Sequence, residues 1–255
     1  MSRYADNNKS LVLISDGYTD GLDFNSQSQF INKFPIDLDC QTSEFEMALT
    51  KIKFPNSIYN LPNGEIHNMR IIHTDTSEII VELSAGYYSL EGVLSHISSK
   101  LNVLSLNLNP TSMKVVITSN RDVKGLKINF SKTLGELLGF ESDSDLEMGD
   151  EGEMVASDIH NMNPNDQLYI YCSMIGAEHV VGGALTNLLC VCPISTRTFN
   201  ECVVYEPKHL TFLPVKRQHF LYCTIYIYDH SGKRQSFEQG SVEVYVRLRR
   251  VSPFL

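Results

Sequence analysis

The sequence lacks the short motifs that mark common catalytic and nucleotide-binding sites. It has no G-x-S-x-G, no H-E-x-x-H, no P-loop and no G-x-G-x-x-G preceded by a strand pattern. The eight histidines are scattered, mostly in expected loops or at strand ends, where a solvated imidazole is the simpler interpretation. Gly182-Gly183 indicates a turn or bulge, since a phosphate cradle would need a following helix with a lysine. We therefore predict a protein that is not an enzyme and that needs no cofactor.

A zinc site has little support, because the sequence has no C-x2-C pair and no histidines at ligand spacing. Cys190 and Cys192, together with Cys172, are the one set that could be argued as ligands. The cysteines lie mostly within apolar or alternating runs, which small buried thiols explain better; they are Cys40, Cys172, Cys190, Cys192, Cys202 and Cys223. We expect free thiols in a reducing compartment and no metal.

Positive charge and long apolar runs are also scarce. The formal charge is -9 at pH 7, whereas a surface that binds phosphate backbones needs concentrated Lys and Arg. No apolar run approaches the length of a membrane-spanning helix, and the patch from Leu11 to Ile14 is broken by Ser15 and Asp16, unlike a signal peptide. We expect a protein made in the cytosol, with no direct nucleic-acid partner and no membrane span.

Two runs near the C-terminal end alternate with period 2, which is the pattern of a half-buried strand. In the first run, the aliphatic side carries Leu221, Cys223, Ile225 and Ile227, and the other side carries Tyr222, Thr224, Tyr226 and Tyr228. In the second run, the aliphatic side carries Val242, Val244, Val246 and Leu248, and the other side carries Glu243, Tyr245, Arg247 and Arg249. Turn residues separate the two runs, so we predict that these strands lie near one another in an antiparallel β-structure.

Further short strand patterns lie between residues 29 and 60 and after residue 166, which is typical of a sandwich or barrel. The period changes once, where Ser89 precedes five apolar residues at helical spacing: Leu90, Val93, Leu94, Ile97 and Leu101. A short helical turn over 133–138 is predicted to end at Gly139 in the left-handed conformation.

Two stretches are predicted to lie outside these elements. Residues 1–27 are polar and rich in Gly and Asp, and we expect an N-terminal arm. Its apolar residues keep a docking role open beside the alternative of a disordered terminus; they are Leu11, Val12, Leu13 and Ile14.

Residues 141–153 (ESDSDLEMGDEGE) are acidic with no balancing base. A calcium loop starting at Asp143 would need Gly at its sixth position and Glu at its twelfth, where the sequence has Met148 and Met154. We expect a solvated, mobile loop here, and an acidic and polar linker over 146–165.

Five segments, in this order and spacing, carry a family resemblance: FEMALTKIKFPNSIYN, AGYYSLEGVLSHISSKLN, KINFSKTLGELLGF, QLYIYCSMIGAEHVVGGALTNLLCVCP and FLPVKRQHFLYCTIYIYDHSGKRQSFEQGSVEVYVRLRR. Together they resemble the minor capsid, or penton, proteins of the Polinton/Maverick (adintovirus-like) elements. Virophage pentons and the adenovirus penton base are more distant relatives. The resemblance runs from about Phe30 to Arg250.

The resemblance implies a mostly β fold, namely a single jelly-roll β-sandwich with an inserted small α+β subdomain. Residues 28–60 and 166–255 would form the jelly roll and residues 61–145 the insertion. It also implies a homopentamer without catalytic residues that closes the five-fold vertices of an icosahedral capsid. The sequence departs from an adenovirus-like penton in having no R-G-D motif and no long insertion for fibre attachment.

The implied partners are other copies of the chain, a double-jelly-roll major capsid protein, and a vertex spike or cement protein. The implied location is the virion, with synthesis in the host cytoplasm and capsid assembly in the nucleus. The alternative hypothesis is a non-viral β-sandwich binding module, lectin-like or cytokine-like, because fold does not fix function.

The polar sides of the two C-terminal strands are the candidate subunit or partner interface: Tyr222, Tyr226, Tyr228, Tyr245, Arg247 and Arg249. Tyr and Arg are enriched at the centres of interfaces. The alternative is a solvated face.

Overall fold

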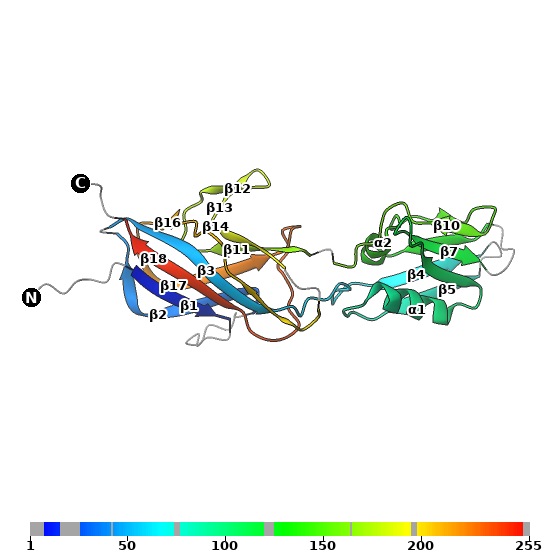
Figure 1. Cartoon of the computed structure of the whole chain (residues 1–255), viewed down its shortest axis with the longest axis horizontal. Coiled ribbons are helices and arrows are strands. Elements are labelled where there is room, and N and C mark those ends of the chain that lie inside the picture. Colours follow the sequence, from blue (N-terminus) through cyan, green and yellow to red (C-terminus); the bar gives the residue numbers. More distant parts are fainter. Residues whose placement is uncertain are drawn as a thin grey trace, which may run out of the picture. The chain divides into compact units, whose positions relative to one another are not determined.

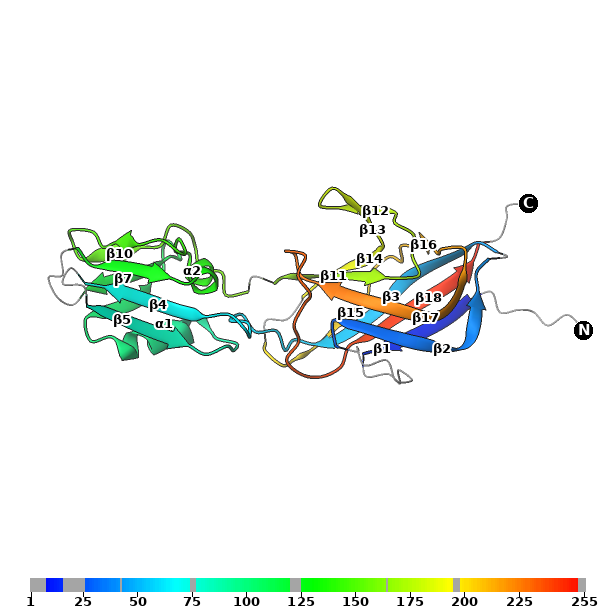
Figure 2. The same cartoon turned by 180° about the vertical axis from the view of Figure 1, so that it is seen from behind.

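The computed structural model describes residues 8–15, 26–41, 43–73, 77–119, 125–163, 165–194 and 198–251. The chain forms two compact units, one of residues 1–58 with 165–255 and one of residues 59–164. Figures 1 and 2 show both units from opposite sides.

Two antiparallel sheets form the first unit (Figure 1). One has the order β1 (Asn8–Ile14), β18 (Glu243–Arg250), β3 (Phe45–Pro55) and β15 (Cys202–Tyr205), with the short β16 (Leu213–Pro214) also pairing with β3. The other has the order β14 (Leu188–Pro193), β11 (Gln167–Cys172), β17 (His219–Tyr228) and β2 (Gln29–Asp39). A separate hairpin of β12 (His179–Val181) and β13 (Ala184–Thr186) lies between β11 and β14 in the sequence.

Leaving aside the short β16, the eight strands of the two sheets pair in a nested way along the chain. The first pairs with the last (β1 with β18), the second with the seventh (β2 with β17), the third with the sixth (β3 with β15), and the fourth with the fifth (β11 with β14). Nested pairing is what a long hairpin gives when it is wound into two facing sheets, which is the jelly roll. The predicted fold class is confirmed.

The core of the first unit lies between the two sheets. The aliphatic sides predicted for the two C-terminal strands are buried from Cys223 to Ile227 and from Val242 to Leu248. Leu221 is the exception, because it is 46% exposed while Phe220 is buried. These two strands belong to different sheets, so their polar sides form two separate surfaces rather than the single stripe that the sequence suggests.

The expected N-terminal arm over 1–27 is wrong for residues 8–14, which form strand β1 along β18. Leu13 is 2% exposed and belongs to the core, whereas Val12 and Ile14 face outward. The side chain of Ser15 accepts a hydrogen bond from the backbone N–H of Val242, which fixes the end of the strand. The rest of the predicted arm lies outside the described residues, apart from 26 and 27.

The second unit has two small sheets and two helices. One sheet has the order β5 (Glu78–Leu83), β4 (His67–Ile72), β8 (Lys127–Phe130) and β9 (Leu146–Glu147), and the other has β10 (Glu153–Val155), β7 (Val115–Ser119) and β6 (Leu104–Leu108). They share one core with the helices α1 (Leu90–Lys100) and α2 (Lys132–Leu138).

Both helices agree with the sequence-based predictions. The hydroxyl of Ser89 accepts a hydrogen bond from the N–H of Gly92, which caps the N-terminus of α1. Helix α2 ends at Gly139, whose φ is +82°. A Cβ at Gly139 would lie 2.3 Å from the carbonyl oxygen of Asp158, so glycine is required there on two counts.

The acidic stretch is part of the second unit and is neither a free loop nor a linker. Leu146–Glu147 pairs with β8, and Glu153–Val155 pairs with β7. Met148 and Met154 are buried while the acidic side chains from Glu141 to Glu153 are exposed. The segment ESDSDLEM therefore contains a short alternation. Leu146 and Met148 pack against the unit, and the acidic residues remain in water. The boundary expected at 145 lies at 164 instead.

Strand β1 gives a direct test of this correction. Leu13→Ala should lower the free energy of unfolding by about 2–5 kcal/mol, because it leaves a cavity in a packed core. Val12→Ala is the matched control, since Val12 is 49% exposed on the same strand, and it should change stability by no more than about 0.5 kcal/mol. Urea unfolding of both variants measures the difference. Equal stability of the two variants would mean that the segment is an arm after all.

Candidate assembly surfaces

Four tyrosines gather on the outward side of the sheet that contains β17, and we call them the tyrosine patch: Tyr169, Tyr171, Tyr226 and Tyr228. Tyr169 pairs with Tyr228 and Tyr171 pairs with Tyr226 across β11 and β17. The rings of Tyr171 and Tyr228 meet edge to face with centroids 5.4 Å apart. Partial burial raises the pKa of the Tyr171 hydroxyl, so this phenol stays neutral.

Two members of the tyrosine patch were predicted from the sequence and two were not. Tyr226 and Tyr228 belong to the candidate interface, whereas Tyr169 and Tyr171 come from the alternating segment QLYIYC of β11. Only the pairing of β11 with β17 brings these two tyrosines beside the predicted residues. Half-buried tyrosines of this kind offer a large apolar area with polar tips, which suits a protein contact.

The second surface lies on the outward side of the other sheet, and we call it the β18 face. The hydroxyl of Tyr245 donates a hydrogen bond to Glu243 Oε2 at 2.5 Å, and Lys53 Nζ lies 3.1 Å from Glu243 Oε1. Lys51 Nζ lies 5.4 Å from the centroid of the Tyr245 ring. These partners lower the pKa of the Glu243 carboxyl, and the hydrogen bond from the Tyr245 hydroxyl has the largest effect.

The predicted docking patch joins the β18 face. Val12 pairs with Tyr245 and Ile14 pairs with Glu243 in the ladder between β1 and β18. The side chain of Leu13 is unavailable because it lies in the core, and Leu11 is half-buried and packs against it. The structure therefore combines part of two separately predicted sites into one outward surface.

The two candidate arginines differ in their surroundings. Arg249 donates to Glu46 Oε2 from Nε at 2.9 Å and from Nη2 at 2.7 Å, and its guanidinium lies 3.5 Å from the centroid of the Phe212 ring. Arg247 is exposed and has no ion pair or side-chain hydrogen bond within the described part of the chain. Arg247 is thus the arginine that is available to a neighbour.

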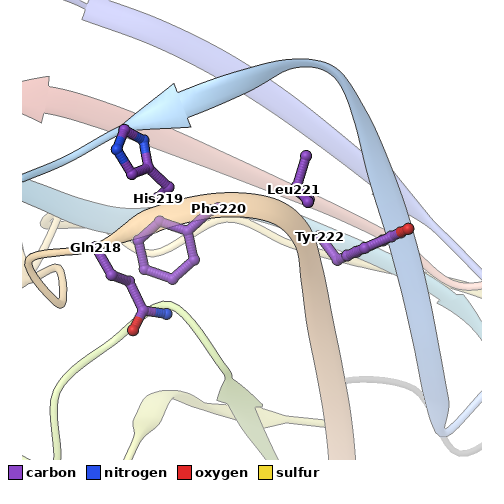
Figure 3. Close-up of a pocket in the computed structure, with 5 residues that line it drawn as sticks. All are labelled: Gln218, His219, Phe220, Leu221 and Tyr222. Atoms are coloured by element: carbon purple, nitrogen blue, oxygen red, sulfur yellow. The ribbon is translucent and has the colours of Figure 1, made fainter.

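Tyr222 lies apart from the tyrosine patch, beside a hollow of about 480 Å³. Between the pairs of Phe220 with Leu38 and Tyr222 with Lys33, residues 34–37 of β2 stand opposite Leu221 alone. Pro35 explains this bulge, because proline has no N–H for the ladder and is tolerated in sheets at bulges and edge strands. Figure 3 shows Leu221 on the side of β17 that faces the bend of β2 (light blue).

The described residues include free thiols but no candidate metal site. No group of three or more His, Cys, Asp or Glu that could hold a metal ion occurs among them. All six cysteines are unpaired thiols, and burial raises the pKa of Cys192 to about 12, which makes it a poor nucleophile. Within the same residues, no helix is long and apolar enough to cross a membrane.

Comparison with solved structures relates the chain to a penton protein through its fold. No protein-family model matches it, and no curated protein matches it. The mavirus penton protein superposes with a TM-score of 0.53 and 11% identity, over 96% of this chain and 100% of that one. The Sputnik virophage structure gives a TM-score of 0.49 and 9% identity, over 96% and 98% of the two chains. The chain thus has the mostly β fold of a penton protein.

The hydrogen bond between Tyr245 and Glu243 predicts a measurable change in acidity. Tyr245→Phe should raise the pKa of the Glu243 carboxyl toward its ordinary value, because the largest stabilising partner of the carboxylate is lost. A lowered carboxyl pKa gives stability that is present above the ordinary pKa and is lost as the pH falls through the folded value. Carbon-detected NMR titration of Glu243 measures the shift. Tyr226→Phe is the control and should leave Glu243 unchanged.

Proposed function

We propose that this chain is a penton, a structural capsid protein that forms a homopentamer and closes the five-fold vertices of an icosahedral capsid. The observation that carries the proposal is the end-to-end match to a penton protein, which includes the inserted unit as well as the jelly roll. The family resemblance of the sequence segments points to the same role independently of that match.

The character of the surfaces supports a structural role. The two surfaces are on opposite sides of one rigid sandwich, and each combines aromatic rings with hydroxyl or charged tips. A subunit with neighbours on more than one side needs several separated contact areas, whereas a binding module needs one. A role without catalysis fits the described residues.

The proposal extends to partners and location. We infer that the pentamer sits among copies of a double-jelly-roll major capsid protein and carries a spike or cement protein at the vertex. We further infer a place in the Polinton/Maverick lineage, with the adenovirus penton base as a distant relative. The chain would reside in the virion after synthesis in the host cytoplasm and assembly in the nucleus.

The oligomeric state tests the core of the proposal. Native mass spectrometry of the purified chain at micromolar concentration should give a species of about 144 kDa, five times the 28.8 kDa chain. Co-expression with the major capsid protein should place the chain at the vertices of particles seen by electron microscopy. A chain that is absent from such particles and binds a soluble glycan would instead be a non-viral β-sandwich binding module.

Arg247 tests whether the β18 face takes part in assembly. Arg247→Glu should leave the free energy of unfolding within about 0.5 kcal/mol of the parent, because the side chain is exposed and unpaired among the described residues. It should weaken pentamer association by roughly 2 kcal/mol if this arginine is desolvated against a neighbour.

The matched control is Lys100→Glu, which makes the same charge change at an exposed residue of the second unit. Denaturant unfolding and analytical ultracentrifugation measure the two quantities. If both variants assemble like the parent, the β18 face around Arg247 is a solvated surface.

A further inference from the structure

The hairpin of β12 and β13 exposes two apolar side chains, Val180 and Leu185, which we call the knob. They pair directly across the two strands and are 68% and 67% exposed. The turn between the strands is Gly182-Gly183, both with positive φ, which makes a tight hairpin. The couple of Val180 and Leu185 is the middle one of its three cross-strand pairs. The hairpin is not part of either main sheet of the first unit, and Figures 1 and 2 show it standing off from the sandwich. A lone two-stranded hairpin is marginal in water, so this one gains from a partner.

The hollow beside β17 also exposes large side chains, as the knob does. Leu221 and Tyr222 line it and are 46% and 40% exposed, although both belong to an otherwise regular strand. Its volume is about 480 Å³, and it is open to solvent. The residues that line it are 218–222, and Leu221 lies on the side of β17 that faces the bend of β2 (Figure 3).

The knob and the hollow belong to different parts of the same sheet. The hairpin leads directly into β14 at one edge, whereas the residues that line the hollow belong to β17 or directly precede it, next to the other edge strand, β2. Two strand spacings of about 4.8 Å separate β14 from β17, roughly 10 Å, and the hairpin stands on the side of β14 away from β2 (Figure 2). The knob therefore does not fill the hollow of its own chain.

The knob and the hollow also lie at the same end of the sheet along the strand direction. Strand β11 ends at Cys172, which pairs with Ile225, so its end lies toward the start of β17 at His219. The hairpin follows that end after six residues, and the hollow is formed by residues 218–222. Two different surfaces toward one end of a sheet, one beyond β14 and the other on β17, can make a head-to-tail contact between copies, and such a contact forms a ring when the rotation closes.

We propose that the β12–β13 hairpin of one copy inserts Val180 and Leu185 into the hollow at Leu221 and Tyr222 of the next copy. This contact rests on the proposed pentamer and names the surfaces that hold neighbouring copies together. Charges near the two surfaces agree with it: Glu178 precedes the hairpin and has no ion pair among the described residues, and Lys33 pairs with Tyr222 in the ladder. The imidazole of His219, which lines the hollow, already lies 3.7 Å from the carboxylate of Asp39.

Reciprocal variants test the contact. Leu185→Glu and Leu221→Glu each put a charge on one half of it, and each should raise the concentration for half-maximal association about 30-fold or more, as expected for a hot-spot residue. Ile159→Glu is the control, because Ile159 is 61% exposed on the second unit, and it should leave association unchanged. Circular dichroism checks that all variants keep the β-fold.

A charge exchange tests the pairing itself. Leu221→Lys alone should weaken association like Leu221→Glu, and combining it with Leu185→Glu should recover at least tenfold over either single variant. A general surface effect would not produce this recovery. Analytical ultracentrifugation of the full-length chain from about 1 to 500 µM measures all cases.

The outcomes separate this contact from the vertex role. If the parent is a pentamer and both glutamate variants assemble like it, the hairpin contact is overturned and the vertex role stands. If the parent forms a ring of another size that both variants dissolve, the contact stands and the vertex role fails. A parent that is monomeric up to 500 µM overturns the contact, and co-expression with the major capsid protein then decides the vertex role.

Discussion

Burial of two aliphatic sheet faces against each other is the constraint on which the jelly-roll unit depends. Cys223, Ile225 and Ile227 of one sheet and Val244 and Val246 of the other are at most 1% exposed and share one core. Each such side chain contributes roughly 1.5–3 kcal/mol on burial, so a one-residue slip of either strand would forfeit most of the driving force. The inward sides are therefore fixed, and the outward sides are the ones that are left to carry tyrosines, charges and contacts.

The second unit can be inserted between two strands of the jelly roll because it has a core of its own. It leaves the jelly roll after β3 and returns before β11, which are the third and fourth of the eight nested strands. No nested pair is separated in space by this insertion, since β3 pairs with β15 and β11 with β14. Inside the unit, stacked rings of Phe130 and Phe140 belong to a separate apolar cluster. Its surface can thus change without altering the contacts of the sandwich.

The sequence predicted the features that depend on residues close together in the chain. The alternation from Cys223 to Ile227 and the capped helix at Ser89 each reflect one element, and both were visible in the sequence. Strand β1 was missed because Val12 and Ile14 are apolar but face outward, which hides the alternation, and because its partner β18 lies more than 200 residues away. The outward position of Leu221 was missed for a related reason: Pro35 in the neighbouring strand breaks the ladder, and only the pairing of β2 with β17 connects the two.

Pro35 links the protection of a sheet edge to the contact that is proposed at Leu221. An edge strand with a regular ladder invites further strands to add, and a proline bulge prevents this. The same bulge leaves Leu221 opposite four residues of β2, and Leu221 is one of the residues that line the hollow. The contact proposed there would use side chains instead of backbone hydrogen bonds between strands. Strands can add to a free sheet edge without limit. A recess that accepts one hairpin in one orientation would instead fix the rotation between neighbouring copies, which is the condition for a closed ring.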